Sequence, residues 1–179
     1  VDVLWGLGLA NKNKILEEGQ MMENGDASNF ASTGGWTLGV NDPMQYYSKY
    51  SYITLSDKQQ KEVSEIAGNI YRPCCGNSTH FPDCNHGMAA LGLIELMVSQ
   101  GFSKDEIYKT VLAFNTYWFP ETYLNVAYYF QSNDRDYNSA SPKEILSKTF
   151  SSAMGAEAIQ KKVGSIQWFG SSSGGSCGA

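Results

Sequence analysis

The residue types best suited to chemistry lie in one short segment of the chain. Three of the four cysteines and both histidines fall between residues 74 and 86, in the stretch CCGNSTHFPDCNH. Thiolate and imidazole groups are the ligands that zinc, copper and iron–sulfur centres use in proteins. The clustering therefore predicts a metal centre built on this loop.

The spacing of the cysteines suggests how many ligands the centre has. Cys74 and Cys75 are adjacent and can bond to each other only through a strained disulfide, Cys84 follows nine residues later, and Cys177 is the remaining thiol. Four thiolates are the usual ligand set of an iron–sulfur cluster. We therefore predict an iron–sulfur centre with a role in electron transfer, with zinc or copper as alternatives. The predicted ligands are Cys74, Cys75, Cys84 and Cys177, with His86 in reserve.

A second interpretation of the same cysteines involves no metal. An even count of four fits two disulfides in an exported protein, with three pairings open. The chain would then be a disulfide-stapled structural or self-assembling subunit at the cell surface, without a cofactor. His80 is a single side chain in a polar loop, and we expect it to be a bystander or a hydrogen-bond donor to a ligand. Whether Cys177 acts within its own chain or on a neighbouring one stays open.

Part of the cysteine loop resembles the CDGSH iron–sulfur motif. The shared pattern is C-x-x-S-x-x-F-P-x-C, in which the end positions are Cys75 and Cys84. In that family one residue separates the first two cysteines, and a histidine follows the last cysteine by four residues. Here Cys74 adjoins Cys75, and His86 follows Cys84 by two. The resemblance therefore implies ligand roles for Cys75 and Cys84 alone.

A wider segment, about residues 56–107, is similar to bacterial lipoproteins with a PCYCGC motif. In both, a helix leads into a proline–cysteine cluster, here Pro73-Cys74-Cys75-Gly76, and then into a Gly-Phe-Ser helix start, here at residues 101–103. This resemblance implies an extracytoplasmic setting in a bacterium: periplasmic, secreted or at the cell surface. It implies no activity.

The elements on either side of the cysteine loop have helical patterns. Ser56 and Gln59 form a capping box ahead of apolar residues at helical spacing, and this helix is predicted to end at Pro73. Residues 88–100 are apolar almost all round and precede Gly101, as in a buried central helix with a left-handed cap. The loop is therefore expected to be held between two helices.

The rest of the chain predicts a mainly α fold. A capping box at residues 103–106 starts one helix, Pro120 starts another that runs to about residue 131, and helical segments continue to about residue 163. Residues 36–55 are rich in aromatic residues and β-formers, so a small β or extended element is expected there. We predict a single compact domain of about five helices over residues 1–170, followed by a Gly/Ser tail at 171–179 that carries Cys177.

Composition excludes several classes of protein. The 179 residues are 42% apolar, which argues against disorder, and no stretch approaches the roughly 20 apolar residues of a membrane span. The net charge is −5 with scattered basic residues, which argues against a nucleic-acid partner. No H-E-x-x-H, P-loop, G-x-G-x-x-G or C-x-x-C-H motif is present, so we do not expect an enzyme. The expected partners are further copies of the chain or a redox protein.

Overall fold

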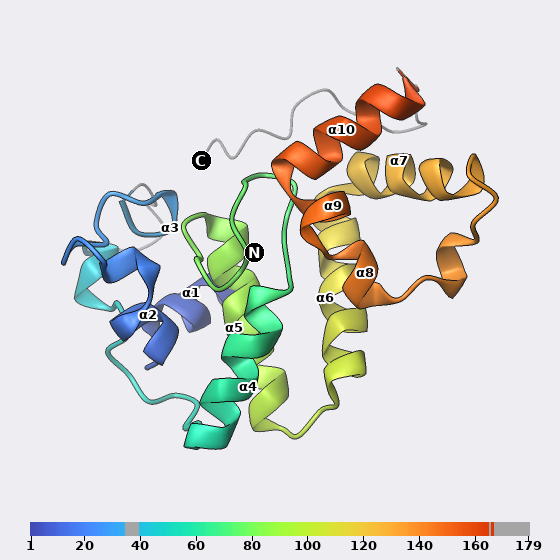
Figure 1. Cartoon of the computed structure of the whole chain (residues 1–179). Helices are drawn as coiled ribbons and strands as arrows, with labels where there is room; N and C mark the ends of the chain where they lie inside the picture. Colours follow the sequence, from blue (N-terminus) through green and yellow to red (C-terminus); the bar gives the residue numbers. More distant parts are fainter. Residues whose placement is uncertain (35–39, 165, 167–179) are drawn as a thin grey trace.

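The computed structural model describes residues 1–34, 40–164 and 166. Across these residues the chain forms ten α-helices and three short 3-10 helices, with no β-strand and only two isolated β-bridges (Figure 1). The predicted mainly α fold is confirmed. The helix count exceeds the predicted five because the chain also forms helices of four to nine residues, which are too short to leave a clear periodic pattern.

Helix α5 (Asn85–Ser99) is the centre of the molecule, as predicted. It is buried on nearly every side, and Gly101, two residues after its last residue, has a φ of +79°, the left-handed conformation expected there. Helix α4 (Asp57–Gly68) packs against α5 and begins with the predicted capping box between Ser56 and Gln59.

Helix α1 (Asp2–Ala10) makes the closest approach to α5. A methyl group on Gly8 would overlap the carbonyl oxygen of Met88, and one on Gly92 would overlap the carbonyl oxygen of Leu4. The two backbones therefore touch at a pair of glycines, which only a residue without a side chain permits. This helix was not predicted, since glycine is a poor helix former and the segment is held by packing rather than by propensity.

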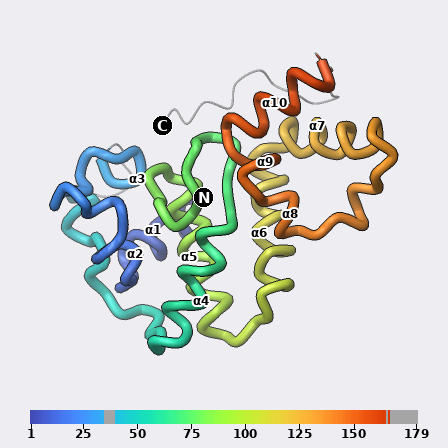
Figure 2. The backbone as a smooth tube through the Cα atoms, in the orientation of Figure 1, coloured from blue at the N-terminus to red at the C-terminus, as the bar shows by residue number. Residues whose placement is uncertain are grey.

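The C-terminal half forms a second group of helices. Helix α6 (Lys104–Trp118) starts at the predicted capping box, α7 (Pro120–Gln131) starts at the predicted proline, and α10 (Ala153–Val163) ends before Gly164. Two short helices, α8 (Pro142–Ile145) and α9 (Lys148–Ser151), lead into α10, which packs on α7 (Figures 1 and 2). This group has its own apolar cluster: Tyr123, Val126, Phe130, Ile145, Phe150 and Ile159.

The segment expected to be β or extended contains no strand in its described part, residues 40–55. Asp42 caps a 3-10 helix, η2 (Pro43–Gln45), by accepting a hydrogen bond from the backbone of Met44. Tyr50 then makes a single parallel bridge to Asn11. Pro43 at the first position of η2 favours the helical geometry, so residues 43–45 are not extended. Residues 35–39 lie outside the described part of the chain.

Before this segment the chain forms three short helices. They are α2 (Lys14–Glu18), η1 (Gln20–Met22) and α3 (Ala31–Gly34). A further 3-10 helix, η3 (Tyr137–Ser139), interrupts the polar loop before α8.

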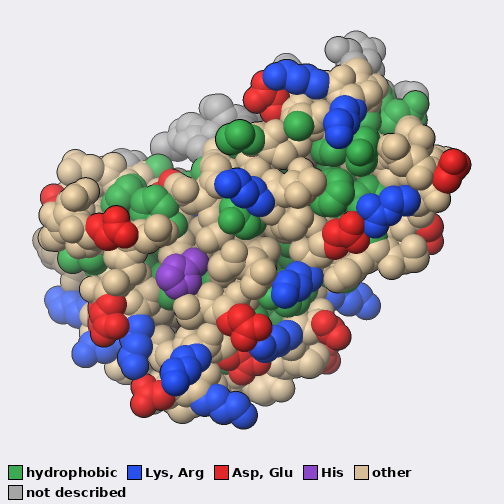
Figure 3. All heavy atoms as spheres, viewed as in Figure 1, with side chains coloured by type: hydrophobic (Ala, Val, Ile, Leu, Met, Phe, Trp, Pro, Cys, Tyr) green, Lys and Arg blue, Asp and Glu red, His purple; other side chains and the backbone are tan. Residues whose placement is uncertain are grey.

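The surface agrees with the low charge of the sequence. Acidic and basic side chains alternate over the face seen in Figure 3. No described helix has the length and apolar character needed to cross a membrane. The division into a domain at residues 1–170 and a tail stays a prediction, because the tail lies outside the described residues.

Candidate metal centre

Residues 69–84 join α4 to α5 and form the loop that carries three cysteines (Figures 1 and 2). Helix α4 ends at Gly68 and not, as predicted, at Pro73. The reason is that the next residues form hydrogen bonds elsewhere: the Ile70 carbonyl accepts from the Thr79 amide at 2.8 Å, and the Tyr71 amide donates to Leu146 at 2.9 Å. The loop is thereby tied to itself and to α8.

A buried arginine organises this loop from inside. The Arg72 side chain is fully buried and donates to the carbonyl of Asn77 at 3.0 Å and to that of Phe81 at 3.2 Å. It also forms an ion pair with Asp83 at 2.9 Å and donates from Nε to the Cys84 sulfur at 3.2 Å. A buried charge is tolerated when it is paired and hydrogen-bonded, and Arg72 meets both conditions.

The loop brings Cys74, Cys75 and Cys84 together. The Cys84 sulfur lies 3.4 Å from the Cys74 sulfur and 3.8 Å from the Cys75 sulfur, and all three sulfurs lie within 4.8 Å of one another. The sequence places the adjacent cysteines beside each other but does not show that both reach the same third thiol. This group is able to hold a metal ion.

Cys84 is the sulfur with the strongest stabilisation of its thiolate form. It is the N-cap of α5 and accepts a hydrogen bond from the Gly87 amide at 3.3 Å. Hydrogen bonds from the thiols of Cys74 and Cys75, together with the positive charge of Arg72, lower the pKa of the Cys84 thiol far below its ordinary value. A thiolate is the form that binds metal and reacts as a nucleophile.

The other two thiols are less buried and hold their protons more tightly. Cys74 shares hydrogen bonds with Cys75 and Cys84, and these together with burial raise the pKa of the Cys74 thiol. The hydrogen bond with Cys74 lowers the pKa of Cys75, but the hydrogen bond to Cys84 and burial outweigh it and raise that pKa to about 12. A cation bound by all three sulfurs would displace these protons, since metal ligation requires thiolates.

His86, the predicted reserve ligand, lies in the first turn of α5 but is not part of the sulfur group. Its ring packs against Phe119 and Trp118, with centroid distances of 4.6 and 5.4 Å. Its Nδ1 is buried and has no hydrogen-bond partner among the described residues. Burial lowers the pKa of His86, which favours the neutral ring that a metal ligand requires.

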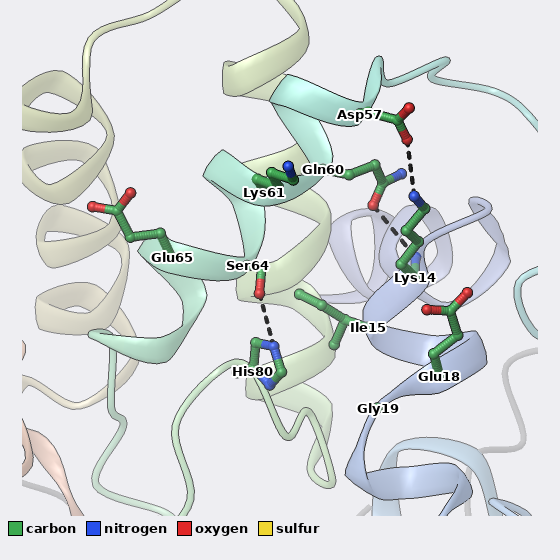
Figure 4. Close-up of a pocket in the computed structure, with 10 residues that line it drawn as sticks. All are labelled: Lys14, Ile15, Glu18, Gly19, Asp57, Gln60, Lys61, Ser64, Glu65 and His80. Carbon is green, nitrogen blue, oxygen red and sulfur yellow. Dashed lines mark hydrogen bonds and ion pairs between the residues drawn. The ribbon is translucent and has the colours of Figure 1, made fainter.

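His80 belongs to a different part of the surface. It lines a cavity of about 720 Å³ between α2 and α4, and its Nε2 lies 2.9 Å from the hydroxyl of Ser64 (Figure 4). Lys14 and Asp57 form an exposed ion pair across the same cavity. His80 is not part of the group of three sulfurs, and its predicted role as a bystander or as a donor to a ligand stays a prediction.

The fourth predicted ligand, Cys177, lies outside the described residues. The group seen in the structure is thus three of the four predicted cysteines, and the involvement of Cys177 stays a prediction.

Arg72 is the residue of the site that the sequence analysis missed. It is one of only two arginines in the chain and directly precedes Pro73-Cys74-Cys75. An isolated arginine beside a thiol cluster is a signal for charge compensation, because arginine is the residue best suited to buried ion pairs.

Comparison with known proteins adds no assignment to this geometry. No family model, no curated protein and no solved structure matches the chain.

Proposed function

We propose that this chain is a metal-binding protein whose centre is one soft metal ion held by the thiolates of Cys74, Cys75 and Cys84. The supporting observation is the spacing of the sulfurs. With a zinc–sulfur bond of about 2.3 Å, two thiolates on one tetrahedral ion lie about 3.8 Å apart. The separations of 3.4 and 3.8 Å from Cys84 match this spacing.

The same spacing bears on which metal is bound. Thiolates select zinc, copper(I) and iron–sulfur clusters. A cluster distributes its thiolates over two or more iron ions and so needs them farther apart than a single ion does. The geometry therefore favours a single ion over the iron–sulfur centre predicted from four cysteines, and the electron-transfer role stays a prediction.

The charge of the site favours zinc over copper(I). The Arg72–Asp83 ion pair is neutral as a whole, so three thiolates around a divalent ion leave the site with a net charge of −1. Around copper(I) the net charge is −2, which costs more free energy than −1 in a largely buried site.

Elemental analysis and visible absorption of the full chain, purified under anaerobic reducing conditions, test this proposal. We expect a colourless protein with about one zinc ion per chain. Cys74→Ser, Cys75→Ser and Cys84→Ser should each lose most of the metal. A coloured, iron-containing protein would support the iron–sulfur prediction and overturn the single-ion site.

The matched control is Cys177→Ser, the same change outside the group of three. We expect it to keep its zinc. If it loses metal as the other three variants do, the four-cysteine site predicted from the sequence is correct and the three-cysteine site is wrong.

The disulfide interpretation requires the same cysteines to be paired in a particular way. Three clustered thiols form only one disulfide at a time, so two disulfides require Cys177 to pair with the thiol left over. Intact mass before and after reduction distinguishes the cases, because two disulfides take up four hydrogens while a metal centre releases free thiols on denaturation. A chain without metal and with two disulfides would replace the metal proposal by a stapled structural subunit.

The proposed setting is outside the cytoplasm, in the periplasm, secreted or at the cell surface. It is supported by the weakly charged composition and by the resemblance of residues 56–107 to the PCYCGC lipoproteins. Fractionation of the native cells, with the chain detected by antibody, tests it: recovery with the cytoplasmic fraction alone would contradict it.

A further inference from the structure

The three sulfurs are not equivalent in their access to solvent. Cys84 is only 6% exposed, whereas Cys74 and Cys75 are half-buried. A small oxidant therefore reaches Cys74 or Cys75 first. Cys84 lies behind them, in contact with both sulfurs.

Of the two outer thiols, Cys74 is better placed to bond to Cys84. Its sulfur is the nearer one, at 3.4 Å against 3.8 Å for Cys75. The backbone of Cys75 is also fixed on both sides, because its amide donates to Arg72 and its carbonyl accepts from Ala153 at 2.9 Å. A disulfide needs its sulfurs to move to about 2.05 Å, and Cys74 needs the smaller movement.

We propose that Cys74 and Cys84 form a two-electron thiol–disulfide couple that takes its oxidising equivalents from a low-molecular-weight disulfide. The Cys74 thiol passes its proton to the Cys84 sulfur 3.4 Å away, and the Cys74 sulfur attacks the small disulfide, forms a mixed disulfide and expels one small thiolate. The Cys84 sulfur then attacks the Cys74 sulfur, forms the Cys74–Cys84 bond and expels the second thiolate. The small disulfide gains two electrons, the two cysteines lose them, and any protons on the cysteines pass to the departing thiolates.

Oxidation also removes two of the three metal ligands. This part of the inference rests on the proposed function, because it requires the same sulfurs to hold the ion. A sulfur in a disulfide is no longer a thiolate, and the thiolate is the ligand. Cys75 alone does not retain the ion, so each Cys74–Cys84 bond should release one metal ion.

The test treats the reduced, zinc-loaded full chain with oxidised glutathione in defined ratios to reduced glutathione. Thiols are then alkylated, cross-linked peptides are mapped by mass spectrometry, and free zinc is followed with a chromogenic chelator. We expect a Cys74–Cys84 cross-link, alkylated Cys75 and one zinc ion released per cross-link. A Cys75–Cys84 cross-link with alkylated Cys74 would overturn the assignment of the couple.

Two variants, both measured without metal, test which cysteines form the couple and in which order they react. Cys75→Ser is the matched control and should form the cross-link as the wild type does. Cys84→Ser should stop at a stable glutathione adduct on Cys74, because the resolving thiol is missing. An adduct that does not accumulate in Cys84→Ser would contradict the order of the two steps.

Failure of the couple and failure of the metal site give different results. If the reduced chain binds no zinc but still forms the Cys74–Cys84 cross-link, the proposed function is wrong and the couple stands. If zinc binds and no cross-link forms, the couple is wrong and the metal site stands. Zinc that stays bound while the cross-link forms would overturn the release step alone.

Discussion

Two buried ionisable side chains lie on or beside α5, Arg72 beside its first turn and Glu95 in its second half, and their surroundings compensate their burial differently. Near the start of α5, Arg72 is paired with Asp83 and donates to two carbonyls and to the Cys84 sulfur. In the second half of α5, the Glu95 carboxyl is fully buried and accepts hydrogen bonds from the side-chain amides of Asn11 and Asn13. Among the described residues no cation is paired with it. Burial raises the pKa of Glu95 to about 8, although these two amides oppose the shift.

The contrast shows what a buried charge needs to stay ionised. The Arg72 guanidinium is intrinsically charged, and an opposite charge with several hydrogen bonds compensates its burial, whereas two neutral amides do not offset the desolvation of ionised Glu95. The cysteine loop is therefore organised by a permanent charge. The junction of α1 and α2, where Asn11 and Asn13 lie, is held by a group whose charge depends on pH.

Removal of the permanent charge should have the largest effect. Arg72→Ala leaves Asp83 and Cys84 without their partner and opens a cavity, so we expect a loss of about 3–5 kcal/mol in the free energy of unfolding. Urea unfolding followed by circular dichroism measures it. The matched control is Arg135→Ala, the other arginine, whose ion pair with Glu144 is exposed and whose loss should cost about 1 kcal/mol. Equal losses for the two variants would show that Arg72 does not organise the loop.

The next effect depends on pH. Because the pKa of Glu95 is raised in the folded state, the folded chain binds more protons than the unfolded chain between the ordinary pKa of 4.5 and about 8. The stability from the protonated carboxyl is thus fully present below pH 4.5 and is lost as the pH rises to 8, on the order of 4 kcal/mol in total. Glu95→Gln should remove this slope.

The free energy of unfolding of Glu95→Gln and wild type, measured at several values across that range, checks this prediction. Glu157→Gln, a change on the exposed surface of α10, should keep the wild-type slope. A wild-type slope in Glu95→Gln would mean that the carboxyl does not titrate in this window.

A smaller effect should follow from separating α1 from α5. In Gly8→Ala the new methyl group meets the Met88 carbonyl, which belongs to a helix backbone and cannot move aside, so we expect a loss of about 1–3 kcal/mol. Gly6→Ala is the matched control in the same helix: its methyl group meets no atom, and alanine should stabilise the helix by about 0.5–1 kcal/mol. Thermal unfolding of the two variants should therefore shift in opposite directions.

The smallest effect on stability is expected at His80, whose side chain lines the cavity between α2 and α4. His80→Ala removes the contact with Ser64 and should cost about 1 kcal/mol or less, with the metal content of the chain unchanged. A loss of metal comparable to that of Cys84→Ser would place His80 in the centre after all.

Where local chemistry decides the structure, the structure could be predicted from the sequence. The capping boxes at Ser56 and Ser103 fix two helix starts through contacts three residues apart, and the apolar run of α5 has only one environment that suits it. The proximity of Cys74, Cys75 and Cys84 could also be expected, since they lie within eleven consecutive residues, while their role as ligands stays a prediction.

Where contacts between distant segments decide the structure, the structure could not be predicted from the sequence. The helix at residues 2–10 exists because Gly8 meets Gly92, and no pattern within those nine residues announces that contact. The position of Arg72 likewise depends on how the loop folds back to offer the carbonyls of Asn77 and Phe81. Contacts of this kind are tertiary, and single-sequence patterns describe mainly what neighbours do.

The buried guanidinium also determines how a ligand would be acquired. In a zinc finger the metal and the fold form together, so part of the binding free energy is spent on ordering the chain. Here the loop is closed by bonds from Arg72 to Asn77, Phe81 and Asp83, none of which involves a metal ion. On the proposed function, these bonds between protein groups would hold the three sulfurs around a common point without help from the ion. Uptake and release can then proceed by exchange at the sulfurs, without unfolding and refolding of the protein around them.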